Sequence, residues 1–207
     1  MLIVDNISFF IDNRIIFKNV TFELHSGCIL KLIGANGSGK TTLLRILAGL
    51  NKTKSGSIFW NFFNIDKNLS YYLDDIIFIS HKQNLHFLLT PLENISFQVD
   101  IFNSIKIVSV DDALVYMGLN YNLMNSYSYK LSAGESQRVI LSRLLINSSK
   151  LWILDEPFSY LDFESIILLN KIISNFLFNG GIVILSDHSN VILNLKIDFL
   201  LNLELYK

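Results

Sequence analysis

Short apolar runs separated by turns fill the first third of the chain. Runs of this length are typical of β-strands, and they cover residues 2–4, 15–17, 20–24, 29–33 and 57–60. Between Gly39 and Gly49 the pattern changes, because TTLLRILAG directly after a glycine-rich turn predicts a helix. The first third is therefore expected to be mostly strand, with one early helix.

The rest of the chain predicts a different order of elements. From about residue 91 to residue 130, PLENISF and DDALVYMGL are helix-like and polar stretches separate them, which predicts a helical insert. The last third returns to alternation, with helix, strand, helix and strand expected at residues 133–146, 151–154, 163–177 and 182–186. Strands that alternate with helices imply an α/β fold with a mainly parallel sheet.

Composition narrows the class of protein. The 207 residues carry 17 Lys and Arg against 18 Asp and Glu, a net charge of −1, and this length suits one domain or one domain with an inserted subdomain. A near-neutral balance disfavours a nucleic-acid binder, which is usually basic, and 13% aromatic residues disfavour a disordered chain. Cys28 is the only cysteine, which excludes a disulfide framework and a cysteine-rich metal site.

The mean hydropathy of +0.41 raises the question of a membrane segment. The most apolar charge-free stretch, residues 172–186, is interrupted by Asn175, Asn179 and a glycine pair, whereas a spanning helix needs about 20 mostly apolar residues. The apolar start meets Asp5 at once and lacks a basic segment, so we expect neither a membrane span nor a signal peptide. The apolar excess then reflects either drift in composition or an apolar surface that docks on a partner.

A glycine-rich segment between a predicted strand and a predicted helix fits the phosphate-binding pattern G-x4-G-K-[ST]. Its nucleotide-binding candidates are Gly34, Ala35, Asn36, Gly37, Ser38, Gly39, Lys40, Thr41 and the adjoining Thr42. Glycines let backbone N–H groups surround a phosphate, and the helix N-terminus adds its positive dipole. Lys40 is expected to reach the outer phosphates, and Thr41 is expected to place its hydroxyl on Mg²⁺. The alternative is a glycine turn that only ends the strand.

Two carboxylates follow the predicted strand at residues 151–154. They lie at its carboxyl end, where ligands collect in open parallel sheets. Asp155 is expected to hold Mg²⁺, directly or through water, and Glu156 is expected to polarise the water that attacks a γ-phosphate. The alternative is a solvated acidic loop after a core strand.

Two further positions carry weaker signals. Ser132 opens a predicted helix ahead of small residues, which makes either an anion-binding helix end or a simple N-cap. His188 follows the predicted strand at residues 182–186 and an Asp, and a lone His near a sheet edge is often structural.

Taken together, these segments resemble the ATPase domain of ABC transporters. GANGSGKT resembles the Walker A motif, LSAGE the ABC signature, and LWILDEP the Walker B motif. SYLD at residues 159–162 resembles the D-loop, and His188 stands where that family has its switch histidine. The resemblance covers essentially the whole chain.

The resemblance implies a P-loop NTPase fold of the ABC type, with a mainly parallel core sheet, an N-terminal antiparallel β subdomain and a helical insert. Residues 1–207 then form a single domain, in which 1–90 and 131–207 are the ATP-binding core and about 91–130 is the helical subdomain. It implies ATP and Mg²⁺ as ligands, with Glu156 and His188 catalytic. It further implies a head-to-tail homodimer, in which Ser132 and Gly134 contact the ATP on the second subunit.

The chain departs from the family pattern at several positions. The signature has Ala133 and Glu135 where Gly and Gln are usual, so a negative charge is added near ATP. Counted back from LTPLEN, the Q-loop glutamine position holds Lys82, with Gln83 next to it, and either residue could serve. Phe10 is the candidate for stacking on adenine, and the alternative is that it belongs to the core.

Several details narrow the resemblance further. The short length, LSAG, WILDEPF, His81 before the Q-loop position, LTPLEN and GGIVILSDH resemble the ATPase subunits of cytochrome c maturation haem exporters. This implies transmembrane transporter subunits as partners, and a peripheral location on the inner face of the bacterial cytoplasmic membrane or on the mitochondrial inner membrane. The alternatives are a soluble ABC ATPase of the iron–sulfur cluster assembly type and the ATPase of an exporter for another substrate.

Overall fold

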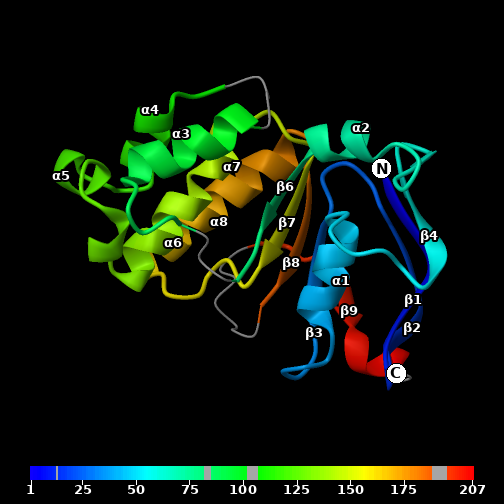
Figure 1. Cartoon of the computed structure of the whole chain (residues 1–207). Helices are drawn as coiled ribbons and strands as arrows, with labels where there is room; N and C mark the ends of the chain where they lie inside the picture. Colours follow the sequence, from blue (N-terminus) through cyan, green and yellow to red (C-terminus); the bar gives the residue numbers. More distant parts are fainter. Residues whose placement is uncertain (13, 82–84, 102–106, 188–194) are drawn as a thin grey trace.

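The computed structural model describes residues 1–12, 14–81, 85–101, 107–187 and 195–207. It contains two sheets with helices packed around them (Figure 1). Within the described ranges, no helix combines the length and the apolar character that crossing a membrane requires.

The larger sheet has five strands, and every neighbouring pair is parallel. This confirms the expected parallel sheet. Two of its strands, β6 and β9, were not among the elements expected from the sequence, and β7 is one residue longer than expected. In spatial order the strands are β6 (Ile76–Ile79), β7 (Leu151–Asp155), β8 (Ile182–Ser186), β3 (Ile29–Ile33) and β9 (Phe199–Asn202).

The smaller sheet is antiparallel and belongs to the N-terminal part of the chain, as expected. The runs at 15–17 and 20–24 are one strand rather than two. Its register with β1 shifts several times, and Asn19 adopts a left-handed φ of 58°, a conformation that Asn tolerates better than most residues. These irregularities interrupt the alternation of apolar and polar residues. For the same reason the strand expected at 2–4 is shorter than β1. The strands in order are β2 (Arg14–Leu24), β1 (Leu2–Ile11), β4 (Ser55–Trp60) and β5 (Phe63–Asn64).

The parallel sheet separates two hydrophobic cores. Because side chains alternate along a strand, Leu151 and Ile153 of β7 enter one core while Trp152 and Leu154 enter the other. The first core also holds α1 (Lys40–Leu47) and the buried face of the antiparallel sheet, so this helix lies between the two sheets. The second core holds the helices of the other face, α3 (Pro91–Ile101), α4 (Val110–Tyr116), α6 (Ala133–Leu141), α7 (Arg143–Ile146) and α8 (Phe163–Phe178).

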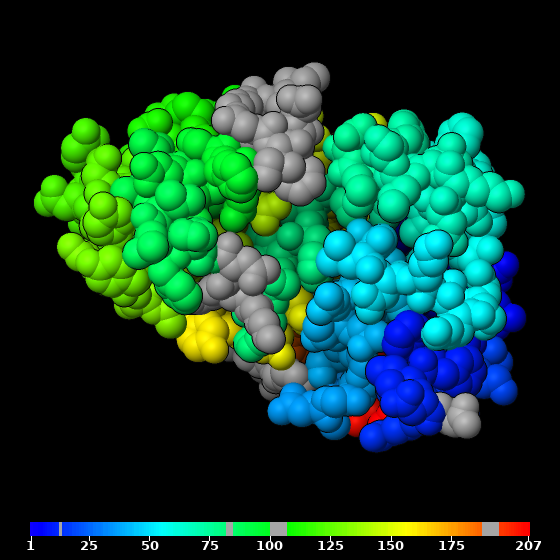
Figure 2. All heavy atoms as spheres, in the orientation of Figure 1, coloured from blue at the N-terminus to red at the C-terminus, as the bar shows by residue number. Residues whose placement is uncertain are grey.

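The described part of the segment from 91 to 130 is helical. After α3 and α4 come α5 (Tyr121–Met124) and the 3₁₀ turn η1 (Ser128–Lys130). Buried Asn94 ties the segment together, because its amide donates to Ser128 Oγ at 3.0 Å and its oxygen accepts from the His86 N–H at 2.7 Å. In Figure 2 this green segment and the blue and cyan N-terminal part of the chain lie on opposite sides of the molecule.

Two elements differ from the expected helices. The single helix expected at 133–146 is two helices, because Ser142 caps the end of α6 and its hydroxyl bonds back to the Val139 carbonyl at 2.7 Å. Such back-bonding by serine competes with the regular helix ladder. The helix expected at 163–177 ends one residue later, at Phe178. The short helix α2 (Leu69–Asp74) and the C-terminal turn η2 (Leu203–Tyr206) were not expected.

Candidate functional site

The glycine-rich segment forms the loop between β3 and α1, as the pattern predicted. Two of its glycines are required by geometry. A Cβ on Gly39, which has φ 106°, would lie 2.6 Å from Ile16 Cγ2, and a Cβ on Gly34, φ 146°, would lie 2.6 Å from Ser38 Oγ. The loop therefore folds so tightly that only glycine fits at these two positions.

Lys40 lies over the inner side of this loop. Its ammonium donates to the Gly34 carbonyl at 2.7 Å and to the Ala35 carbonyl at 3.1 Å, and the residue is only 6% exposed. Burial lowers the pKa of the Lys40 ammonium, while the nearby carboxylates of Glu156 and Asp155 oppose that shift. A buried cation at the start of a helix gives the loop the positive charge that a phosphate group requires.

Ser38 supplies a polar atom that the protein leaves unsatisfied. Its hydroxyl oxygen is buried, and it makes no hydrogen bond to any part of the chain that the structure describes. Buried polar groups in native proteins nearly always have partners. An oxygen-rich ligand such as a phosphate fits this orphaned hydroxyl in the glycine loop.

Thr41 and Asp155 meet at the carboxyl end of the parallel sheet. The Thr41 hydroxyl donates to Asp155 Oδ2 at 2.8 Å, and the Ser186 hydroxyl donates to Asp155 Oδ1 at 2.6 Å. Hydroxyl and carboxylate oxygens are ligands that suit Mg²⁺, which takes few protein ligands beside a nucleotide. In the described ranges no group of three or more His, Cys, Asp or Glu side chains could hold a metal. The Thr41–Asp155 pair therefore fits an ion that is mostly coordinated by phosphate and water.

Glu156 projects from the turn that follows β7. Its backbone has a left-handed φ of 52°, and its N–H donates to both the carbonyl and the hydroxyl of Ser186, at 3.1 and 3.0 Å. Its carboxylate lies 3.1 Å from His81 Nδ1 and 3.4 Å from Ser159 Oγ. The side chain is 26% exposed, so the carboxylate is held by neighbours and still reaches solvent.

Ser132 is the N-cap of α6, as one of the two interpretations of the sequence predicted. Its hydroxyl accepts from the Glu135 N–H at 3.2 Å, and Glu135 Oε2 accepts from the Ser132 N–H at 2.7 Å. This reciprocal pair is a capping box. Hydrogen bonds from Ser132 lower the pKa of the Glu135 carboxyl, so the charge expected near ATP is held in the cap.

Gly134 lies against the segment after β7. A Cβ at this position would be 2.8 Å from the Tyr160 carbonyl oxygen, so a side chain here would collide with backbone. A hollow of about 280 Å³ lies beside this contact and is lined by Ser132, Gly134, Arg138, Tyr160, Asp162 and Ser165 among others. The structure therefore brings the start of α6 and residues 159–162 together at one surface.

Comparison with known proteins identifies the family. Residues 17–159 match the family described as ABC transporter. The cytochrome c biogenesis ATP-binding export protein CcmA of Aliivibrio fischeri is 34% identical over 94% of this chain and 95% of its own length. The same-named protein of Vibrio vulnificus is 38% identical over 92% and 93%. The chain belongs to the ABC transporter family, in its group of cytochrome c biogenesis ATP-binding export proteins.

This ABC transporter protein is an ATP hydrolase. A dimeric post-hydrolysis structure of the ATP-binding cassette MJ0796, bound to ADP and Pi, is similar to it with a TM-score of 0.77 and 27% identity, over 92% of this chain and 90% of that one.

Three residues that the sequence pointed to lie outside the described part of the ABC transporter protein, and a fourth, Phe10, lies in β1. Lys82, Gln83 and His188 lie outside the described residues. Phe10 lies half-buried in β1, paired with Ile15 of β2, and its role in adenine binding stays a prediction.

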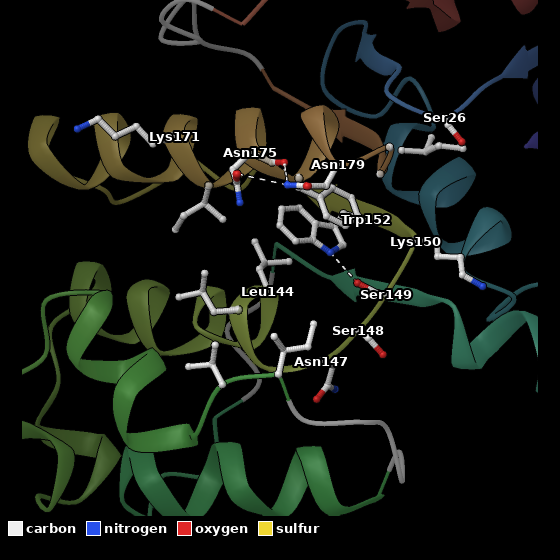
Figure 3. A pocket seen from close by; sticks show the side chains of 18 of the residues that line it. Ser26, Leu144, Asn147, Ser148, Ser149, Lys150, Trp152, Lys171, Asn175 and Asn179 are labelled. Carbon is white, nitrogen blue, oxygen red and sulfur yellow. Dashed lines mark hydrogen bonds between the residues drawn. The ribbon is translucent and has the colours of Figure 1, made fainter.

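A separate cavity of about 930 Å³ lies at the amino ends of β7 and β8 (Figure 3). Trp152 stacks on Phe176 there with ring centroids 3.6 Å apart, and its indole N–H donates to Ser149 Oγ at 2.8 Å. The described residues that line this cavity include neither the glycine loop nor Asp155 and Glu156. It is therefore distinct from the candidate nucleotide site, which lies at the carboxyl ends of the strands.

The sequence analysis missed two residues of the candidate nucleotide site. Ser186 bonds to both Asp155 and Glu156, and its position at the end of a predicted central strand was a usable signal. Glu204 of η2 accepts from the Ala35 N–H at 3.0 Å, and nothing local in the sequence pointed to that contact.

Proposed function

We propose that this protein is the ATP-hydrolysing subunit of a bacterial membrane complex that powers haem export, or release of a haem-loaded chaperone, in c-type cytochrome biogenesis. The observation that carries the proposal is the similarity, over more than nine-tenths of the chain, to proteins named for cytochrome c biogenesis export. The relatives named above are bacterial, and we therefore propose the inner face of the bacterial cytoplasmic membrane and not the mitochondrial inner membrane.

In the proposed reaction the glycine loop and Lys40 bind the phosphates of ATP. Thr41 and Asp155 hold Mg²⁺, which when bound neutralises charge on the β- and γ-phosphate oxygens. Glu156 orients and polarises the attacking water at the end of β7, and His188 contacts the γ-phosphate. Ser186 keeps Asp155 and Glu156 in place through the two hydrogen bonds of its hydroxyl and a third to its carbonyl.

The proposed assembly is a head-to-tail homodimer with two composite ATP sites. Ser132 and Gly134 of each subunit contact the ATP held by the Walker A loop of the other. The hollow beside Gly134 and Tyr160 supports this role, because it opens the capped end of α6 to a ligand. ATP binding then closes the dimer and hydrolysis reopens it.

The proposed contact with transmembrane subunits lies on the helical segment from 91 to 130 and on the neighbouring Q-loop, where Lys82 or Gln83 acts. Exposed apolar patches of this kind commonly mark interaction sites. Seven large apolar side chains of the described part of this segment are exposed: Phe97, Ile107, Val115, Tyr116, Tyr121, Tyr127 and Tyr129.

Capture of membrane partners tests this function. We expect the tagged protein, purified in mild detergent from its own host, to bring down a transmembrane subunit, and a deletion strain to accumulate the haem-loaded chaperone. Phe97→Asp should abolish capture, whereas Phe178→Asp, which alters a side chain that is 90% exposed at the end of α8, should not. A complex that is fully soluble and has no membrane subunit would overturn the proposal in favour of an iron–sulfur assembly ATPase. An unchanged chaperone level would point to an exporter of another substrate.

A further inference from the structure

His81 and Glu156 are brought together by the register of two parallel strands. In the β6–β7 pair, Ile79 lies opposite Leu154. His81 comes two residues after Ile79, and Glu156 comes two residues after Leu154, so both side chains leave the same edge of the sheet. The resulting distance from His81 Nδ1 to Glu156 Oε2 is 3.1 Å.

The imidazole of His81 is restrained on its other side. Its ring stacks on Tyr160 with centroids 6.4 Å apart and an interplanar angle of 28°. The backbone carbonyl of Tyr160 lies against Gly134 at the start of α6, and the side chain of Tyr160 is 58% exposed. His81 therefore lies between the Glu156 carboxylate and an aromatic ring from the segment that packs on α6.

Glu156 is contacted by His81 and by other groups. Its side chain is 26% exposed, and a long flexible carboxylate at that exposure samples several rotamers unless it is bonded. Ser186 accepts hydrogen bonds from the backbone N–H of Glu156, and Ser159 Oγ lies 3.4 Å from its Oε2. His81 Nδ1 lies 3.1 Å from Oε2, nearer than Ser159 Oγ, and this distance allows an ion pair with a protonated imidazole.

We infer that His81 is a positioning residue for Glu156: its Nδ1–H donates to Glu156 Oε2 and holds the carboxylate where it meets the attacking water. The inference rests on the proposed role of Glu156 in hydrolysis. It assigns His81 no contact with ATP. It also means that the segment after β6, which leads into the Q-loop position, is mechanically joined to the carboxylate that activates water.

A double-mutant cycle on ATP hydrolysis by the purified full-length protein tests the inference. His81→Ala should lower kcat about tenfold with unchanged KM and nucleotide affinity, because misplacing a catalytic group by about 1 Å costs up to about 100-fold. His81→Asn should recover most of the rate, because its side-chain N–H occupies the place of Nδ1–H. In a Glu156→Gln background, His81→Ala should have no further effect, because the carboxylate that His81 positions is gone.

A second histidine–carboxylate pair serves as the matched control. His25 Nε2 lies 3.2 Å from Glu23 Oε1 on an exposed surface, and His25→Ala should leave all kinetic constants unchanged.

An unchanged or raised kcat in His81→Ala would overturn the inference. So would a raised KM, or rate losses that multiply in the double variant. If Glu156→Gln alone hydrolyses ATP at the normal rate, the role of Glu156 fails and the inference fails with it; if Glu156→Gln is slow and His81→Ala is normal, only the inference fails.

Discussion

The hydroxyl of Thr41 donates a 2.8 Å hydrogen bond to the carboxylate of Asp155, although 114 residues separate them in the chain. Their elements are not adjacent, because β8 lies between β3 and β7 in the sheet. The glycine loop crosses that strand and delivers the start of α1 to the end of β7. The fold of the chain itself therefore brings together the two groups proposed to hold Mg²⁺.

Thr41→Val tests the magnesium role, because it keeps the shape of the side chain and removes its oxygen. In EDTA we expect the nucleotide affinity of the variant to stay within about twofold of that of the unmodified protein. The increase in affinity that Mg²⁺ gives should be lost. The kcat should fall about 100-fold, since one preorganised ligand is worth about 2–4 kcal/mol. Titration of a fluorescent ATP analogue with and without Mg²⁺ measures this. Thr53→Val in the turn before β4 is the control. An undiminished Mg²⁺ effect would remove Thr41 from the ion.

Lys40→Ala tests the phosphate loop. The ammonium is buried against the Gly34 and Ala35 carbonyls, so its loss removes positive charge where the outer phosphates are expected. We expect ATP affinity to fall by 10-fold to 100-fold, about 1.4–2.7 kcal/mol, as measured by calorimetry. Lys52→Ala, on the exposed turn after α1, should bind normally. Equal affinities for the two variants would rule out the proposed phosphate contact.

Glu156→Gln separates binding from hydrolysis. The amide keeps the size of the side chain but cannot accept a proton from water, so turnover should fall by about 10²–10⁴ while ATP affinity persists. Because hydrolysis is proposed to reopen the dimer, we expect the variant to accumulate as a dimer with ATP in size-exclusion chromatography. Glu164→Gln, an exposed change in the first turn of α8, is the control. Normal turnover in Glu156→Gln would assign water activation to another residue.

The glycine loop and the strand ending in Asp155 could be predicted because their signals are local. Gly34, Gly39 and Lys40 stand at fixed spacing, and an apolar run before two carboxylates marks a buried strand whatever its neighbours are. The irregular elements could not be predicted so well. The strand β2 continues through Asn19, although that residue has a left-handed φ. Ser142 separates α6 from α7, although the apolar pattern of the segment is continuous.

The contacts between elements depend on the order and register of the strands, which local sequence patterns do not reveal. Ser186 reaches Asp155 only because β8 is the neighbour of β7. Likewise, His81 faces Glu156 only because β6 pairs with β7 in one particular register. Glu204 reaches the loop at Ala35 from the far end of the chain, after the unpredicted strand β9. A local pattern can identify a reactive residue, but the partners that hold it come from strand order.

Glu135 gives a last prediction, because two interpretations of this residue lead to different outcomes. If the carboxylate serves the capping box, Glu135→Ala should lower the free energy of unfolding by about 1 kcal/mol and leave ATP affinity unchanged, and Glu135→Gln should keep most of the cap. Urea titration measures the stability.

The folded-state pKa of Glu135 lies below its usual value, so its charge stabilises the protein fully above about pH 4.3. This contribution disappears as the pH falls through the lowered pKa. The stability difference between Glu135 and Glu135→Gln should therefore shrink in acid. A several-fold change in ATP affinity or hydrolysis for Glu135→Gln would instead place the charge at the nucleotide.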